Sequence, residues 1–330
     1  MGQGRRIKRL KVSAPSRLHL TLLAMHNGEY RINGGLGFAI ADPSCELTFS
    51  SSVDFSIDDQ RTNPLGCDEL ERLVTLLKTE QKRRGFPVAV DVVINGNMRP
   101  HFGFGSGSAI SLACLEALHR LNGSMPSPSE LVAASGRGGT SGVGIHSYFS
   151  GGCVFDLGRT SDNSAHAPSH HATASRPLLL DQLPMPDWEI GICIPLSVRH
   201  KSQADERAFF ERTCPLPAEA VYETLYHSLF GLYAAIREVD KTTFCNALRA
   251  VQTCAWKKAE WLEYGSSLMD IEQALYTGGA EAVGMSSLGP SLFFLATNVT
   301  ELINQMRLVH PDCEWILTCP ANHGRRLIDA

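Results

Sequence analysis

The sequence predicts an α+β protein built from two lobes, and three observations support this class. The chain has 330 residues and 43% hydrophobic content, enough to bury two hydrophobic cores. Its first half contains a strand at 88–94, a glycine-rich loop at 95–109 and a helix at 110–121. Its second half begins with a strand, continues with helical patterns and ends with further strands, the order of an α/β sandwich. The predicted segments are an N-terminal lobe, an irregular connection and a C-terminal lobe, at 1–160, 161–186 and 187–330.

The composition excludes several classes of function. A formal net charge of −4 and a pI near 6.3 argue against nucleic acid or a membrane surface as the main partner, although a locally basic site could bind a small anion. The 10 cysteines form no Cys-x-x-Cys pair, which is typical of a reduced protein. No stretch reaches the roughly 18 apolar residues of a membrane span, and no secretory signal core follows the basic start. We therefore expect a cytoplasmic protein.

The loop that follows the strand at 88–94 has the composition of an anion-binding site. Its glycines, Gly103, Gly105 and Gly107, allow the backbone to approach a ligand closely. Ser106 and Ser108, together with the first free N–H groups of the helix, can donate to a phosphate. A tight turn with nothing bound would give the same local pattern, so the other polar loops must decide between the two interpretations.

Two segments near the N-terminus add cationic side chains. In the strand around Leu18, Arg17 and His19 are one pleat apart on the same side, which suits contact with an anion or carboxylate; a solvated outer face is the alternative. The stretch 31–37 is predicted to be a second glycine-rich turn, and it supplies Arg31 and Asn33 as candidate substrate-binding residues.

Two further glycine-rich loops lie later in the chain. The loop 136–146 contains five glycines together with Arg137 and ends at His146, and turn formation alone does not explain this composition. The loop 284–290 leads into a strand. Their candidate phosphate-binding residues are Gly138, Gly139, Thr140, Ser141, Gly284, Met285, Ser286, Ser287 and Gly289.

Periodicity and capping signals mark the remaining elements. Leucines recur at helical spacing in 67–84, before Gly85 as a helix stop. Ser127 opens a capping box with proline at the first helical position, so a short helix should run to Ser135. Further helices are expected at 205–212, 217–239, 242–264 and 299–308, and further strands at 147–156, 188–194, 291–296 and 313–318.

The predicted connection 161–186 is rich in Ser, Ala, His and Pro. Its histidines, His166, His170 and His171, could suggest a metal site. Because no cysteine or carboxylate is placed to complete one, we favour a solvated loop.

Several motifs resemble those of the GHMP kinase superfamily, and within it those of the β-ribofuranosylaminobenzene 5'-phosphate synthases. The similarity extends over nearly the whole chain. The motifs, in order, are PSRLH at 15–19, RINGG at 31–35, GSG at 105–107, GRGGTSG at 136–142, CPLP at 214–217 and GMSS at 284–287. The resemblance implies an N-terminal lobe like domain 2 of ribosomal protein S5 and a C-terminal ferredoxin-like α/β sandwich lobe.

The resemblance also implies an activity. These synthases of methanopterin biosynthesis join phosphoribosyl pyrophosphate to 4-aminobenzoate or 4-hydroxybenzoate and release CO2 and pyrophosphate. Mg²⁺ would accompany the pyrophosphate, with Ser108 as a candidate ligand, and no organic cofactor or nucleic acid partner is expected; a homodimer is a possible assembly. Arg17 and Arg137 would neutralise phosphate or carboxylate, and His19 and His146 would handle protons or bind substrate, although a structural role fits each histidine equally well.

The chain departs from the patterns of related proteins at several positions, among them Gly144, Asn33, Ser108-Ala109 and 157–159. Several kinases of the superfamily have a catalytic aspartate seven residues before a Gly-Gly pair, where this chain has Gly144. Asn33 stands where the archaeal synthases tend to have Asp, which removes one possible metal ligand. The alternatives to the synthase are an ATP-dependent small-molecule kinase and a catalytically silent relative that binds phosphate or nucleotide.

Overall fold

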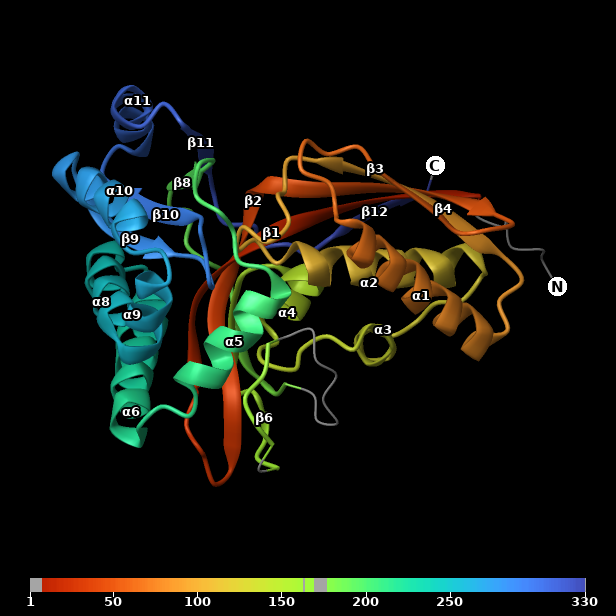
Figure 1. Ribbon diagram of the computed structural model, residues 1–330, viewed down its shortest axis with the longest axis horizontal. Helices are drawn as coiled ribbons and strands as arrows, with labels where there is room; N and C mark the ends of the chain where they lie inside the picture. Colours follow the sequence, from red (N-terminus) through yellow and green to blue (C-terminus); the bar gives the residue numbers. More distant parts are fainter. Residues whose placement is uncertain (1–7, 163, 169–176, 330) are drawn as a thin grey trace.

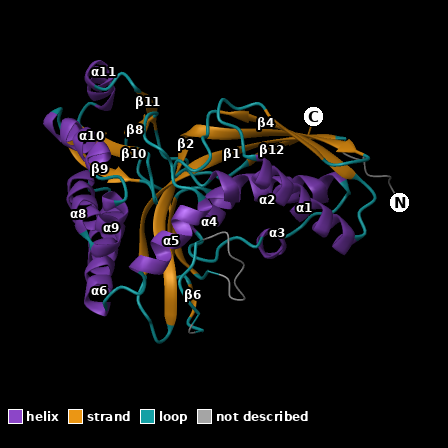
Figure 2. Ribbon diagram, viewed as in Figure 1, coloured by secondary structure: helices purple, strands orange, loops and turns teal. Residues whose placement is uncertain are grey.

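The computed structural model describes residues 8–162, 164–168 and 177–329, and this part of the chain forms two lobes, each with helices packed on a sheet (Figure 1, Figure 2). The sheet of the first lobe has eight strands in the order β12-β1-β2-β4-β3, with β5 and β6 paired to β2 and β7 paired to β5. The sheet of the second lobe has the order β11-β8-β10-β9. No helix in the described ranges is long and apolar enough to cross a membrane.

In the first lobe, α2 and α4 pack on β1 and β2, and α1 and α3 pack on α2. The strands of its sheet are β1 (Arg9–Ala24), β2 (Arg31–Ser52), β3 (Ser56–Asp59), β4 (Ala89–Gly96), β5 (Cys153–Asp156), β6 (Arg159–Thr160), β7 (Leu179–Leu183) and β12 (Arg326–Asp329). Its helices are α1 (Cys67–Arg84), α2 (Ser106–Leu121), α3 (Pro128–Ser135) and α4 (Val143–Ser150).

In the second lobe, α10 packs on β9, and α11 packs on β8, β10 and β11. The strands are β8 (Ile190–Pro195), β9 (Ala280–Met285), β10 (Leu292–Ala296) and β11 (Cys313–Thr318). The helices are α5 (Gln203–Thr213), α6 (Ala218–Tyr226), the π-helix η1 (His227–Tyr233), α7 (Ala234–Glu238), α8 (Lys241–Thr253), α9 (Ala255–Leu262), α10 (Ser266–Thr277) and α11 (Val299–Val309).

The long antiparallel pair of β1 and β2 contacts both lobes. β1 touches α2 and α4 on one side and α6, α8 and α9 on the other. Its N-terminal half alternates buried and exposed side chains, whereas its C-terminal half is covered on both faces. The proposed solvated face at Arg17 and His19 is therefore wrong, since the His19 side chain is only 5% exposed. A register shift between His19 and Thr21 bends the strand at this point.

Several predicted elements are confirmed. α1 spans 67–84 and ends at Gly85, which adopts the left-handed conformation with φ of 65°. Ser127 accepts a hydrogen bond from the N–H group of Glu130 at 3.3 Å, and the predicted capping box begins α3. The predicted strands at 188–194, 291–296 and 313–318 correspond to β8, β10 and β11.

The predicted turn at 31–37 is wrong, because these residues lie within β2. Asn33 and Gly34 have positive φ, but pairing with β1 continues through them. Close packing explains a glycine here: a Cβ on Gly35 would lie 2.7 Å from the His19 Nε2 atom. In this strand the glycines permit close approach rather than a reversal of direction.

Other boundaries were also predicted incorrectly. The expected strand 147–156 begins as helix α4, which buries Val143 and Tyr148, and only its last four residues form β5. The expected helix 217–239 contains the π-helix η1, and the expected helix 242–264 is broken at Cys254, whose backbone is extended. The elements α10 and β12 were not predicted.

Two chain segments cross between the lobes. β12 pairs with β1, so residues 326–329 lie in the first sheet although they follow the second lobe in the sequence. β7, from the predicted irregular connection, pairs with β5. The returning segment is fixed to β2 by two backbone hydrogen bonds, from the Ala321 N–H group to the Ala39 carbonyl oxygen and from the Ala41 N–H group to the Cys319 carbonyl oxygen, each 2.9 Å.

Gly103 is the closest approach of the phosphate loop to the second lobe, and its substitution provides a test. It has φ of 88°, and a Cβ there would overlap the carbonyl oxygen of Ser286. We expect Gly103→Ala to lower the free energy of unfolding by about 3 kcal/mol, because strain at positive φ and overpacking add. Gly123→Ala is the matched control, since Gly123 has φ of 74° with open space around it, and it should cost about 1 kcal/mol. Equal losses in urea unfolding would contradict the close packing.

Candidate functional site

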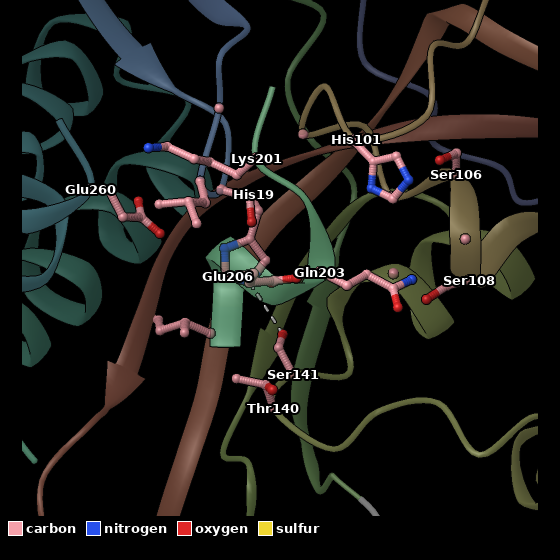
Figure 3. A pocket seen from close by; sticks show the side chains of 18 of the residues that line it. His19, His101, Ser106, Ser108, Thr140, Ser141, Lys201, Gln203, Glu206 and Glu260 are labelled. Carbon is pink, nitrogen blue, oxygen red and sulfur yellow. Dashed lines mark hydrogen bonds between the residues drawn. The ribbon is translucent and has the colours of Figure 1, made fainter. Parts of the chain in front are cut away.

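A pocket between the lobes brings together most of the sequence-predicted site residues (Figure 3). Its walls come from β1, the start of α2, the loop before α4, the start of α5, α9 and the loop after β9. The predicted residues that line it are Arg17, His19, Gly103, Gly105, Ser106, Gly107, Ser108, Arg137, Thr140, Ser141, Ser287 and Gly289.

The glycine-rich loop ends in the N-terminus of α2, which begins at Ser106, four residues earlier than the sequence predicted. Gly105 precedes it in the left-handed conformation with φ of 78°, and no side chain caps this helix. Ser106 and Ser108 therefore belong to the first helical turn, and their side chains appear at one side of the pocket in Figure 3. The N-terminus of a helix carries a partial positive charge and is a ready anion site.

Two arginines flank this helix N-terminus. A Cβ on Gly105 would lie 3.1 Å from the Arg17 Nε atom, and a Cβ on Gly107 would lie 3.1 Å from an Arg137 terminal nitrogen. The Arg17 guanidinium donates to the carbonyl oxygen of Gly103, but its buried Nε has no hydrogen-bond partner. Burial lowers the pKa of Arg17 to about 10, against the opposing effect of Glu206. A bound anion would accept a hydrogen bond from the Arg17 Nε atom and would neutralise part of the positive charge of the two arginines.

His19 lies at the centre of the pocket and contacts both lobes. Its backbone N–H group donates to the Ser286 hydroxyl at 3.0 Å, and its carbonyl oxygen accepts from the N–H group of Ser287 at 3.0 Å. The imidazole Nε2 is 3.3 Å from the Ser141 hydroxyl. Burial, followed by the nearby charges of Arg17 and Lys257, holds the pKa of His19 well below its usual range. The ring is therefore neutral near pH 7.

Asp156 fixes the loop that carries Ser141, a role that the sequence did not reveal. Its carboxylate accepts the backbone N–H groups of Gly142 and Gly158, the latter at 2.8 Å. Burial raises the pKa of Asp156 to about 6, although these hydrogen bonds and one from Ser141 favour the ionised form. Asp156 belongs to β5 and acts through the loop rather than by lining the pocket.

The pocket also contains carboxylates that the sequence did not single out, namely Glu69, Glu206 and Glu260. Glu69 pairs with His101 at 2.9 Å. Glu206 belongs to α5 and lies beside His19 in Figure 3. Burial raises the pKa of its carboxyl group. No motif marks these residues, because α1, α5 and α9 supply them from distant parts of the chain. The remaining pocket residues are Leu22, His101, Gly144, Lys201, Gln203, Phe209, Phe210, Trp256 and Leu288.

A buried lysine supports the loop after β9. The Lys257 ammonium donates to Glu260 and to the carbonyl oxygens of Met285 and Ser287, the last two at 2.7 and 3.3 Å. Burial lowers the pKa of Lys257, although Glu260 opposes the shift. Met285, a predicted binding residue, lies in β9 and does not line the cavity. Its backbone carbonyl oxygen supports the pocket through the hydrogen bond from Lys257.

Arg31 and Asn33 do not line the pocket. Arg31 donates to the carbonyl oxygens of Leu157 and Gly158, at 3.0 and 2.6 Å. Asn33 donates to the carbonyl oxygen of Gly139 at 3.0 Å. Both therefore fix chain segments next to the site. The other predicted residues outside the lining are Gly138, Gly139, His146, Gly284, Met285 and Ser286.

The prediction of a solvated loop is wrong for His166, which is buried. His166 Nδ1 lies 2.6 Å from the Asn33 side-chain oxygen, and its Nε2 lies 3.2 Å from the carbonyl oxygen of His26. His170 and His171 lie outside the described residues. Within the described ranges, one group of three metal-ligand side chains has its ligand atoms within 4.8 Å of one another, Glu223, His227 and Cys254, and none of these lines the pocket.

Gly144 lies on the pocket wall in the first turn of α4. A Cβ at this position would lie 3.4 Å from the Ser108 Oγ atom, so a side chain here would point toward the phosphate loop. The chain thus has no carboxylate at the position where several related kinases carry one.

Comparison with known proteins agrees with this architecture. Residues 70–151 match the family model of the GHMP kinases N terminal domain. Over the whole chain the fold resembles a putative sugar kinase from Campylobacter jejuni (TM-score 0.71, 14% identity, covering 99% of this chain and 100% of that one). It also resembles a homoserine kinase from Cytophaga hutchinsonii (TM-score 0.68, 16% identity, covering 99% and 100%). The fold is that of the GHMP kinase class.

The sequence comparisons define the family more narrowly. The chain is 30% identical over 289 residues to the β-ribofuranosylphenol 5'-phosphate synthase of Methanothermobacter thermautotrophicus, with 86% of this chain and 88% of that protein covered. It is 29% identical over 321 residues to the synthase of the same name from Archaeoglobus fulgidus, with 96% and 98% covered. The chain therefore belongs to the β-ribofuranosylphenol 5'-phosphate synthase family.

The position of Arg137 predicts its contribution to turnover. We expect Arg137→Ala to lower kcat/KM by at least about 100-fold, because a charge-assisted contact to a reacting anion is lost. Arg237→Ala, on an exposed side chain outside the pocket, is the control and should change kcat/KM by less than about twofold. Steady-state kinetics with both variants measures the difference. If the turnover of Arg137→Ala stays within a few-fold of wild type, the loop that carries Arg137 does not contact the reacting groups.

The raised pKa of Asp156 predicts a pH dependence of stability. The ordinary value is 3.8 and the folded value is about 6, so between these limits the folded protein holds a proton that the unfolded chain releases. This contribution favours folding at low pH and is lost as the pH rises through about 6. From pH 5 to pH 7.5 it should fall by roughly 1 kcal/mol, and Asp156→Asn should remove that component. Urea unfolding of both proteins at the two pH values measures it; identical pH dependence would contradict the shift.

Proposed function

We propose that the protein joins the ribose 5-phosphate part of phosphoribosyl pyrophosphate to 4-aminobenzoate or 4-hydroxybenzoate, with release of CO2 and pyrophosphate. The observation that carries this proposal is the pairing of an uncapped helix N-terminus with Arg17 and Arg137 in a pocket of a synthase-family chain. The name of the archaeal relatives describes a product with a ribofuranose phosphate and a phenol. The donor substrate carries two phosphorylated groups, which need this density of anion-binding groups.

The chemistry of the reaction explains why positive charge is needed. The bond between C1 of the ribose and the pyrophosphate oxygen breaks, and the leaving group takes the electron pair. Arg17, Arg137 and the N–H groups at the start of α2 would stabilise the negative charge that develops on that oxygen. They are already held in place by the fold, so little reorganisation opposes the step.

The acceptor supplies the carbon that forms the new bond. The ring carbon that bears the carboxylate attacks C1, and the bond to the carboxylate then breaks to release CO2. The electron pair of that bond restores the aromatic ring, so no proton has to be removed from the attacking carbon. A neutral His19 and a glycine at position 144 are compatible with this scheme, because it requires no general base at that carbon.

Mg²⁺ fits the donor atoms of the pocket. The hard oxygen ligands available are the Ser108 hydroxyl and the carboxylates of Glu69 and Glu206. Among the described residues, the pocket has no group of three His, Cys, Asp or Glu side chains with their ligand atoms close together, as a pre-formed protein site would need. Mg²⁺ in proteins is often bound by one or two carboxylates plus substrate phosphates, and here it would neutralise pyrophosphate charge.

A carboxyl-labelled acceptor tests the proposal. Incubation of the protein with phosphoribosyl pyrophosphate, Mg²⁺ and 4-aminobenzoate labelled in the carboxyl carbon should release labelled CO2. The same incubation without phosphoribosyl pyrophosphate is the control and should release none. ATP-dependent phosphorylation of a metabolite without CO2 release would instead identify a kinase. Phosphate or nucleotide binding without either reaction would identify a silent relative.

A further inference from the structure

One end of the pocket is lined by a buried apolar cluster that the phosphate chemistry does not use. Phe209 and Phe210 come from α5 and Trp256 from α9, and all three line the pocket. The Trp256 ring centroid is 5.1 Å from each phenylalanine ring centroid, and both pairs meet edge to face. Leu22 and Leu288 belong to the same cluster and line the same pocket. A flat apolar ligand has suitable walls here.

Glu260 is attached to this cluster. The Trp256 indole N–H group donates to one Glu260 oxygen at 2.8 Å, and Lys257 donates to the other. Each carboxylate oxygen has two lone pairs, so a further donor can be accepted. In Figure 3, Glu260 lies on the opposite side of the pocket from Ser106 and Ser108, with His19 and Glu206 between them.

The pocket is therefore polarised along its length. The phosphate end combines Arg17, Arg137 and the N-terminus of α2, and it favours anions. The aromatic end presents the Glu260 oxygens, which are hydrogen-bond acceptors and therefore favour an N–H or O–H donor. A ligand complementary to both ends has an anionic group at one end, a flat ring in the middle and a hydrogen-bond donor at the other end.

We propose that the aromatic end is the acceptor subsite, with the aryl ring against Phe209, Phe210 and Trp256, and with the para amino or hydroxyl group donating to Glu260. This assignment rests on the proposed function. It directs the carboxylate-bearing carbon toward the phosphate end, where C1 of the ribose must be for the new bond to form. The reverse orientation would bring the carboxylate of the acceptor against the Glu260 oxygens, which offer it no hydrogen-bond donor, so Glu260 selects the carbon that reacts.

Isothermal titration of the protein with 4-aminobenzoate and with benzoate, in the presence of Mg²⁺ and pyrophosphate, tests the ring contacts. Phe210→Leu should weaken 4-aminobenzoate binding by about tenfold, because an aromatic contact is lost. It should also raise KM for the acceptor by about tenfold, while KM for phosphoribosyl pyrophosphate stays within about twofold. Phe244→Leu is the matched control; Phe244 is also buried but lies in a different core cluster, outside the pocket. It should leave both KM values within about twofold.

Glu260 is tested through the para substituent. Wild type should bind 4-aminobenzoate at least about tenfold more tightly than benzoate, which lacks the donor. Glu260→Gln should reduce that ratio, but it also leaves the buried Lys257 ammonium without its carboxylate and can prevent folding. The double variant Lys257→Met with Glu260→Leu removes both charges, but it also removes the contacts of Lys257 with the carbonyl oxygens of Met285 and Ser287. Its KM for phosphoribosyl pyrophosphate should therefore be measured beside the affinity ratio, and a KM within about twofold of wild type shows that the pocket is intact. The affinity ratio of the double variant should fall below about twofold.

The outcomes separate the subsite from the reaction. If wild type releases CO2 but the Phe210 and Glu260 variants keep wild-type acceptor KM and the wild-type affinity ratio, the subsite assignment is overturned and the proposed function stands. If wild type releases no CO2 but these variants lose aryl affinity as described, the aryl site is supported and the proposed function is overturned.

Discussion

The Ser286 hydroxyl is the contact on which the site depends, because it joins three segments that are far apart in the sequence. It accepts the backbone N–H group of His19 at 3.0 Å and donates to the carbonyl oxygen of Gly103 at 2.7 Å. The first strand, the phosphate loop and the second lobe are thereby held in fixed positions relative to one another. Gly103 can approach Ser286 this closely because it has no side chain. Together with the hydrogen bond from the Ser287 N–H group to the His19 carbonyl oxygen, this junction fixes the two halves of the pocket relative to each other.

Charge is distributed over this framework in a way that favours ligand binding over stability. Arg17, Arg137 and Lys257 are all removed from water, and burial lowers the pKa of each. Glu206 and Glu260 offset part of that positive charge from the second lobe. Buried charges with incomplete partners are costly, and such costs are common at functional sites. A multiply charged anion of the kind proposed as substrate would recover part of this cost on entering the pocket.

The sequence predicted what is encoded locally. The phosphate loop, the capping box at Ser127 and the arginines beside the glycines follow from short motifs with a direct physical meaning. Glu206, Glu260 and Phe210 could not be found in this way, since their function depends on where α5 and α9 pack. The stretch 31–37 was misread because glycine permits both a reversal and a close approach, and only the neighbouring strand distinguishes them. The π-helix η1 likewise has no periodicity signal that separates it from an α-helix.

The return of β12 to β1 limits how the lobes can move. The second lobe is connected to the first by two chain segments, one entering before β8 and one leaving after β11, and the leaving segment is hydrogen-bonded to β2. A body held at two points cannot swivel about a single covalent linker. It can only tilt about the line between them. Access to the pocket is therefore expected to vary by a shallow hinge motion that widens its mouth and keeps the facing walls aligned, so substrates can exchange while the order of groups along the pocket is preserved.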